Sequence, residues 1–246
     1  MRWPYRPIVA HRGGGTLAPE NTLAAIRHGA SLRFKGVEFD VMLSRDGTPI
    51  LIHDETFERT TTGRGSVPAS DYAEIEKFDA GGWHSGPYRG ERVPTFVAAA
   101  TLCRELDLWA NVEIKPAKGY ELQTGRVVGQ LTLDLWRDSP LTPIVSSFSM
   151  EALEAAKEVA PSVPRGMLVK KIPADWQARM QRLECIALHC SYKDLTERMA
   201  AEVAAAGFAL LCWTVNDPIE ARKLLDWGVD CIVTDRLDLI PPDFAG

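Results

Sequence analysis

The stretch FALLCWTVNDPIEARKLLDWGVDCIVT, residues 208–234, contains two apolar runs separated by a helix-like segment. Residues 208–215 and 229–234 are apolar almost throughout, without the alternation of a strand that has one face in water. Such runs are typical of parallel strands that are covered on both faces. Pro218 suits the first turn of the helix between them, and Gly228 suits its end. The stretch therefore predicts a strand–helix–strand unit of a parallel α/β fold.

The same alternation extends over the rest of the chain. Candidate parallel strands start near residues 8, 36, 109, 144, 166, 185, 208 and 230. Eight such strands favour a closed (β/α)₈ TIM barrel over an open sheet. The 246 residues suit one such barrel, which typically needs about 250. We expect a single domain over residues 1–246.

One segment, roughly residues 41–92, interrupts this alternation. Asp46-Gly47 is a strong signal for a two-residue hairpin turn, and an apolar run ending in His53 returns from it. A stretch rich in Gly, Pro, Thr and Ser follows. We interpret residues 41–92 as a hairpin-containing insertion above the C-terminal face of the barrel, too polar and broken to have a core of its own.

Composition and charge limit the functions that the chain can have. Hydrophobic residues make up 46% and charged residues 25%, as in a globular protein that buries a sizeable core. The 28 basic residues are outnumbered by 33 acidic ones, which gives a net charge of −5. This balance argues against nucleic acid as a partner, because no excess basic field exists to neutralise phosphates. A small anionic substrate needs only local positive charge.

The N-terminus and the cysteines favour a cytoplasmic protein. No secretory apolar region precedes His11, and no apolar stretch approaches the ~20 residues of a membrane span, so we expect no transmembrane segment. The five cysteines lack CxxC spacing, and we expect reduced, structural thiols. They are Cys103, Cys185, Cys190, Cys212 and Cys231. The oligomeric state stays open, a homo-oligomer included.

Carboxylates occupy one face of two predicted strands. Glu38 and Asp40 are two residues apart and so share a face, while the residues between and beside them are apolar. Glu113 and Lys115 repeat this design on the next parallel strand. A solvated strand end and a structural salt bridge are the alternatives. We favour a site at the C-terminal end of the barrel, where active sites of this fold lie.

Two histidines are expected to join these carboxylates. The first strand ends in His11-Arg12. If Asp46-Gly47 forms a two-residue turn, the hairpin register places His53 directly across from Asp40. Taken alone, His11 could cap a strand and His53 could lie on an exposed hairpin. Their convergence with the carboxylates favours a functional site.

This set of residue types fits the hydrolysis of a phosphodiester. Carboxylates without a suitable thiolate suggest Mg²⁺ or Ca²⁺, which can polarise a phosphoryl oxygen. Arg12 and Lys115 can neutralise the remaining phosphate charge. His11 and His53 can act as base and acid, in an order that the sequence does not assign.

The chain resembles the glycerophosphodiester phosphodiesterase family along nearly its whole length. The matching motifs are His11-Arg12-Gly13, Pro19-Glu20-Asn21-Thr22, Glu38-Phe39-Asp40-Val41, Asp46-Gly47, His53-Asp54, Arg59-Thr60-Thr61-Thr62-Gly63, Asn111-Val112-Glu113-Ile114-Lys115, Trp213-Thr214-Val215-Asn216 and Gly228-Val229-Asp230. The resemblance implies metal-dependent hydrolysis of small glycerophosphodiesters to sn-glycerol 3-phosphate and an alcohol. The nearest likeness is to the compact bacterial cytoplasmic members.

The resemblance also implies roles for single residues. These are metal ligands at Glu38, Asp40 and Glu113, an acid–base pair at His11 and His53, phosphate contacts at Arg12 and Lys115, and a pocket-wall aromatic at Trp213. An ordinary core tryptophan is the alternative for Trp213. We expect Glu20 and Asn21 chiefly to order the first loop and to start the first helix. His189 either faces the barrel mouth or is a satisfied core histidine.

The sequence leaves four points open: the attacking group, the exact function, the alcohol group and the metal. The attacking group is either water or the glycerol 2-hydroxyl, which would form a cyclic phosphate. A lysophospholipase D-like enzyme that acts on lipids with the same catalytic layout is one alternative function. A non-catalytic barrel that binds glycerophosphodiesters is the other. The alcohol group and the metal are not specified by the sequence.

Overall fold

Eight parallel strands form a closed barrel in the computed structural model of the protein, which describes residues 3–140 and 142–246. They are β1 (Ile8–Ala10), β2 (Gly36–Leu43), β4 (Trp109–Ile114), β5 (Ile144–Ser147), β6 (Arg165–Val169), β7 (Ala187–Ser191), β8 (Ala209–Trp213) and β9 (Cys231–Thr234). Each lies beside the next in this order, and the pairing of β9 with β1 and of β1 with β2 closes the ring. The predicted barrel is confirmed, and each strand starts within two residues of its predicted position.

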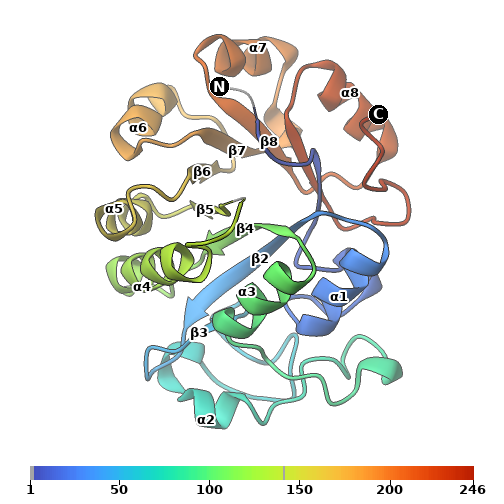
Figure 1. The fold of residues 1–246 in the computed structure, drawn as a ribbon, viewed down its shortest axis with the longest axis vertical. Coiled ribbons are helices and arrows are strands. Elements are labelled where there is room, and N and C mark those ends of the chain that lie inside the picture. Colours follow the sequence, from blue (N-terminus) through green and yellow to red (C-terminus); the bar gives the residue numbers. More distant parts are fainter. Residues whose placement is uncertain (1–2, 141) are drawn as a thin grey trace.

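Helices surround the strands (Figure 1). They are α1 (Leu23–Ser31), α3 (Phe96–Glu105), α4 (Glu121–Leu135), α5 (Met150–Val159), α6 (Trp176–Leu183), α7 (Glu197–Ala205) and α8 (Pro218–Asp226). Short 3₁₀ turns lie at Gly15–Leu17, Val67–Ala69, Gly86–Tyr88 and Tyr192–Asp194. Pro218 begins α8 as predicted, and the Asp217 side chain accepts a hydrogen bond from the Ile219 amide in its first turn.

The apolar residues separate into an outer and an inner layer. Val37, Phe39 and Val41 of β2 are fully buried in the outer layer, between the strands and the helices. An inner cluster that includes Val9 and Leu211 fills the barrel interior on the side where the strands begin. Since alternate side chains of a strand face opposite sides, the outer apolar residues direct Glu38 and Asp40 into the barrel. The prediction that the apolar residues of β2 face the helices, while its carboxylates face the barrel interior, is confirmed.

The hairpin after β2 has a different register from the predicted one. β3 (Pro49–Leu51) pairs antiparallel with β2, and Val41 lies opposite Leu51. The Ile52 amide donates to the Asp40 carbonyl at 3.2 Å, so Ile52 lies opposite Asp40. The prediction that His53 lies directly across from Asp40 is therefore wrong by one residue.

The turn itself explains the shift. The Ser44 amide donates to the Thr48 carbonyl, so the loop contains three residues rather than two. Gly47 has φ +78° at its third position. A three-residue loop that ends in a left-handed glycine is the next most common hairpin connection, and Asp46-Gly47 fits it as well as the two-residue turn. The sequence signal was compatible with both registers.

The segment between β3 and α3 forms a small apolar cluster together with residues of β2, β3 and the loop after β4. Figure 1 shows this segment, with α2 (Tyr72–Ile75), beyond β3 and α3. The cluster consists of Met42, Ile50, Ile52, Phe57, Val67, Ile75, Ala80, Val93 and Ala117, all buried. The expectation that this region is too polar to have a core is therefore wrong. Apolar residues spaced singly among polar ones gave no periodic signal, yet they meet in space.

The five cysteines are unpaired and buried, as predicted. Among the described residues, no helix combines the length and the apolar character needed to cross a bilayer.

Helices α4 and α5 pack closely enough to give a test of the fold. A Cβ atom on Gly125 of α4 would lie 2.3 Å from the Ala152 carbonyl oxygen of α5. We expect Gly125→Ala to lower the free energy of unfolding by about 1–3 kcal/mol, because overpacking outweighs the gain in helix propensity. Urea denaturation measures the change. Gly86→Ala is the control, since its Cβ would meet no atom within 4 Å. Equal stability of the Gly125→Ala protein would contradict this packing.

Candidate active site

One pocket at the C-terminal end of the barrel contains every residue for which a catalytic, metal-binding or substrate-binding role was predicted. Its lining includes His11, Arg12, Glu38, Asp40, His53, Glu113, Lys115 and Trp213, together with Asn111, Phe148, Leu168, Leu211, Thr214 and Val233. These residues come from strands on both sides of the barrel and from the hairpin. The structure thus brings all eight predicted residues together, while their roles stay predictions.

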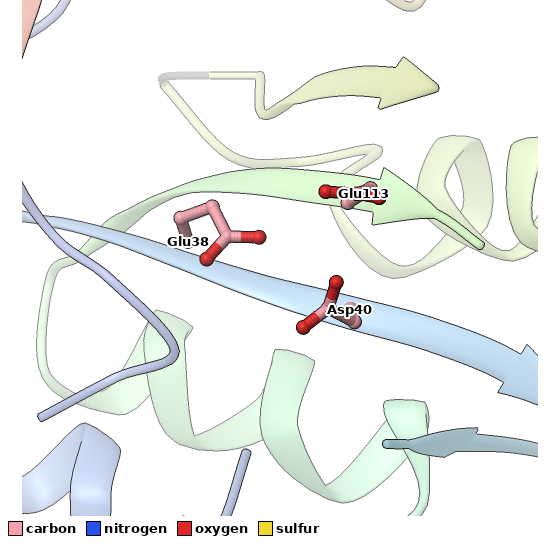
Figure 2. A group of neighbouring side chains, drawn as sticks. All are labelled: Glu38, Asp40 and Glu113. Carbon is pink, nitrogen blue, oxygen red and sulfur yellow. The ribbon is translucent and has the colours of Figure 1, made fainter. Parts of the chain in front are cut away.

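Three carboxylates form the centre of the polar half of this pocket. Glu38 and Asp40 project from β2 and Glu113 from the neighbouring β4, as Figure 2 shows. One oxygen from each lies within 4.8 Å of the others. The exposed fraction is 4% for Glu38 and 1% for Asp40, so water screens these charges little. The register of β2 and β4, which pairs Asp40 with Glu113, produces this convergence.

Burial and mutual repulsion shift the titration of these groups. Burial, followed by the charge of Asp40, raises the pKa of Glu38 to about 7 and that of Glu113 to about 8. Burial acts on Asp40 in the same direction, but the charges of Lys115 and Arg12 outweigh it and lower its pKa to about 2. Burial and mutual repulsion therefore disfavour the ionised forms of Glu38 and Glu113, and a cation among the three carboxyl groups would favour them.

Lys115 and Arg12 contact the carboxylates from two sides. Lys115 Nζ lies 3.1 Å from both Asp40 Oδ1 and Glu113 Oε1. Arg12 Nε lies 3.5 Å from Asp40 Oδ2, and the Arg12 amide donates to Glu38 Oε2 at 3.0 Å. Both cations are thus within the pocket but are engaged by carboxylates. Their predicted contact with phosphate stays a prediction.

His11 is held by a carboxylate that the sequence did not indicate. Its Nδ1 lies 2.6 Å from Asp235 Oδ1, and Asn216 Nδ2 donates to the other oxygen of Asp235 at 3.0 Å. The remaining ring nitrogen, Nε2, lies 3.8 Å from Glu38 Oε2. Burial lowers the pKa of His11, but the Asp235 hydrogen bond and the Glu38 charge outweigh it, so the net pKa is raised.

His53 follows β3 and is oriented by its neighbour in sequence. Its Nδ1 lies 2.6 Å from Asp54 Oδ1, and Arg59 Nε donates to the second oxygen of Asp54. Burial lowers the pKa of His53, a shift that the charge of Asp40 only partly offsets. Each imidazole therefore has a carboxylate on Nδ1, but the pKa of His11 is raised and the pKa of His53 is lowered.

Two loop residues reach the site more directly than expected. Asn21 Nδ2 donates to Asp40 Oδ2 at 2.8 Å, and its Oδ1 accepts from the Asp40 amide at 3.1 Å. Glu20 accepts hydrogen bonds from both Arg12 and Arg59. The expectation that Asn21 starts helix α1 is wrong, because Thr22 caps it. Asn21 instead fixes the carboxylate of Asp40.

Aromatic and aliphatic side chains form the other half of the pocket. Trp213, at the end of β8, packs edge-on against Phe148 with ring centroids 5.4 Å apart. Its indole Nε1 has no hydrogen-bond partner among the described residues. Trp213 therefore lines the pocket and also packs against the inner apolar cluster, while its predicted contact with the substrate stays a prediction. Phe148, which follows β5, was not predicted.

His189 lies inside the barrel and is fully buried. Neither ring nitrogen has a partner within residues 3–140 and 142–246, and burial lowers its pKa to about 3. A Cβ on Gly166 would lie 2.4 Å from His189 Nε2, so the imidazole fills the space that this glycine leaves. It is a neutral core histidine, but it is not a hydrogen-bonded one.

The donor set fits a hard divalent cation. Three carboxylates of two adjacent strands can each offer one oxygen to a shared ion, and oxygen ligands of this kind suit Mg²⁺ or Ca²⁺. The five cysteines are not among the residues that line this pocket, so soft-metal ligands do not compete there. The imidazoles of His11 and His53 and the cations of Arg12 and Lys115 line the same pocket as these three carboxylates.

Comparisons with known proteins agree with this geometry. Residues 11–239 match the glycerophosphoryl diester phosphodiesterase family. The chain is 32% identical to a glycerophosphodiester phosphodiesterase of Caldanaerobacter subterraneus, over 93% of each chain. Its fold is similar to that of a phosphodiesterase of Oleispira antarctica in complex with the product sn-glycerol-3-phosphate. That comparison has a TM-score of 0.88, 35% identity and coverage of 93% and 92% of the two chains. A glycerophosphodiester phosphodiesterase of Agrobacterium tumefaciens has a TM-score of 0.77 at 26% identity, over 98% of this chain and 99% of that one.

Proposed function

Because this chain belongs to the glycerophosphoryl diester phosphodiesterase family and is a phosphoric diester hydrolase, we propose that it hydrolyses glycerophosphodiesters with the aid of a divalent metal ion. The products are sn-glycerol 3-phosphate and an alcohol. The observation that carries the proposal is the convergence of three carboxylates within 4.8 Å, in one pocket with two carboxylate-bound histidines.

We assign the metal to Glu38, Asp40 and Glu113, as Mg²⁺ or Ca²⁺. When bound, the ion would polarise a phosphoryl oxygen and help to ionise an attacking hydroxyl. Asn21 holds the Asp40 carboxylate in place by two hydrogen bonds and so keeps one ligand oxygen directed into the pocket. Such support of a ligand typically matters almost as much as the ligand itself.

His11 and His53 move the protons in this proposal. One imidazole accepts a proton from the attacking oxygen, and the other donates a proton to the departing alkoxide. Asp235 and Asp54 bind the Nδ1 atoms and leave Nε2 of each ring to act on the substrate. Either water or the glycerol 2-hydroxyl can be the attacking group in this arrangement.

Arg12 and Lys115 supply the positive charge that the phosphate needs. A phosphodiester has one negative charge, which these two cations can share once the metal neutralises the carboxylates. Trp213 and Phe148 offer apolar ring surface for the glycerol carbons. The product-bound relative from Oleispira antarctica supports glycerol 3-phosphate as the common part of the substrates.

A metal add-back experiment tests this proposal. We expect the metal-depleted protein to release little glycerol 3-phosphate from glycerophosphoethanolamine, and Mg²⁺ or Ca²⁺ to restore the activity. Calorimetric titration of the same ions should show one site per chain. Full activity after metal removal would contradict the metal assignment. Turnover of lysophospholipid micelles without turnover of glycerophosphoethanolamine would favour a lipid phosphodiesterase, and tight binding without turnover would favour a binding protein.

We also propose a cytoplasmic location. Five unpaired and buried cysteines are compatible with a reducing compartment, where disulfides are rare.

A further inference from the structure

A second groove opens beside the active-site pocket. It is lined by residues that follow three neighbouring strands: Lys170 and Lys171 after β6, Tyr192 and Lys193 after β7, and Trp213 and Thr214 at the end of β8. Trp213 and Thr214 also line the active-site pocket. A substrate that extends past Trp213 would therefore enter this groove.

The groove carries positive charge on a chain that is negative as a whole. Its lining contains three lysines and one acidic residue, Asp194, whereas the net charge of the chain is −5. Lys171 Nζ lies 3.4 Å from Asp194 Oδ1. Lys170 and Lys193 have no ion-pair partner among residues 3–140 and 142–246. Two exposed ammonium groups thus remain available on the path away from the catalytic pocket.

We propose that this groove binds an anionic group on the substrate beyond the scissile phosphate, so that diesters with a phosphorylated alcohol are preferred over diesters of choline or ethanolamine. This inference rests on the proposed glycerophosphodiester hydrolysis. It adds the sign of the charge on the alcohol, which neither the catalytic residues nor the relatives specify.

The chemistry of lysine determines which group fits. An ammonium binds phosphate as a point charge without demanding one orientation, which suits a flexible alcohol in an open groove. A quaternary ammonium would meet charge of its own sign there. Because both lysines are exposed, water and salt weaken each contact, and the two together should change relative rates by roughly three- to tenfold at low ionic strength.

The test compares two substrates that differ by one phosphate, glycerophosphoinositol and glycerophosphoinositol 4-phosphate. For the wild-type protein at low salt we expect the higher kcat/KM with the phosphorylated substrate. The double variant Lys170→Gln/Lys193→Gln should lower the ratio of the two kcat/KM values by roughly three- to tenfold. The charge-reversed variant Lys170→Glu/Lys193→Glu should raise the kcat/KM of glycerophosphocholine relative to that of glycerophosphoinositol 4-phosphate.

A matched control removes the same charge from the opposite end of the barrel. Lys35 and Arg104 line a hollow at the N-terminal end, beside the start of β4 at Trp109. Lys35→Gln/Arg104→Gln should leave the substrate ratio unchanged. An equal fall of the ratio in both double variants would reduce the effect to overall charge and overturn the proposal.

The two proposals fail in different ways. Absence of glycerol 3-phosphate release from both inositol substrates, with the metal supplied, would contradict the proposed function itself. Release from both at a ratio that the Lys170 and Lys193 variants do not alter would leave the hydrolase in place. It would show that these lysines are only solvated surface charge.

Discussion

Replacement of His11 or of His53 by alanine is expected to lower kcat/KM for glycerophosphoethanolamine by about 10²- to 10⁴-fold, the range of general acid–base catalysis. Both rings lie in the pocket, and each has a carboxylate on Nδ1 that leaves Nε2 free for proton transfer. The loss should appear mainly in kcat, because the cations and the pocket wall that would hold the substrate remain. Circular dichroism and thermal unfolding check that each variant is folded.

The control for these variants is His28→Ala, since His28 lies in α1 and does not line the pocket. It should keep the wild-type rate. A folded His11 or His53 variant with near-wild-type turnover would remove that residue from the catalytic pair.

Asp235 gives a finer test of the same assignment. Asp235→Asn should lower kcat less than His11→Ala does, because the imidazole stays but loses its charged partner at 2.6 Å. In a chain that already contains His11→Ala, the Asp235→Asn substitution should lower kcat only slightly further, since Asp235 acts through His11. Additive losses in the double variant would indicate that Asp235 has a separate role.

The barrel could be predicted from the sequence because its strands are short, apolar and regularly spaced. Residues 208–215 and 229–234 gave β8 and β9, and a helix that begins at Pro218 lies between them. The pocket carboxylates followed from the alternation of side chains, since apolar Val37, Phe39 and Val41 had to face the helices. Local pattern is sufficient where one physical rule, burial of apolar surface, decides the outcome.

The hairpin shows where local pattern is insufficient. Asp46-Gly47 fits a two-residue and a three-residue loop, and the choice shifts the pairing of the whole strand by one position. The shift does not affect the prediction that His53 joins the carboxylates. His53 lies beyond the end of β3, where the pleat of the strand no longer fixes the direction of its side chain. His53 still lines the pocket with Asp40, although not for the predicted reason.

The partners of the site residues were missed for a different reason. Asp235 lies 224 residues from His11, and only closure of the barrel brings β9 beside β1. Its position directly after β9 was a usable signal, because the C-terminal strand ends of this fold carry functional residues. Asn21 gave no such signal, since its contacts with Asp40 depend on the conformation of one loop.

Asp40→Asn is expected to weaken divalent-metal binding and to lower kcat/KM by an amount on the order of 10³-fold. Asp40 is nearly fully buried and accepts from both Asn21 Nδ2 and Lys115 Nζ. An asparagine has nearly the same shape but only one oxygen, so it cannot accept from both donors and still offer an oxygen to an ion. Calorimetric titration with Ca²⁺ and steady-state kinetics measure the two effects separately.

The matched control is Asp71→Asn, the same change at an exposed aspartate that pairs with Arg45. It should leave both quantities unchanged, because exposed ion pairs contribute little. The two measurements distinguish two roles for Asp40. A parallel fall of metal affinity and rate supports Asp40 as a metal ligand. A fall in rate at unchanged metal affinity would instead assign it to the orientation of Lys115 and Arg12, and the carboxylates of Glu38 and Glu113 alone would then have to hold the ion.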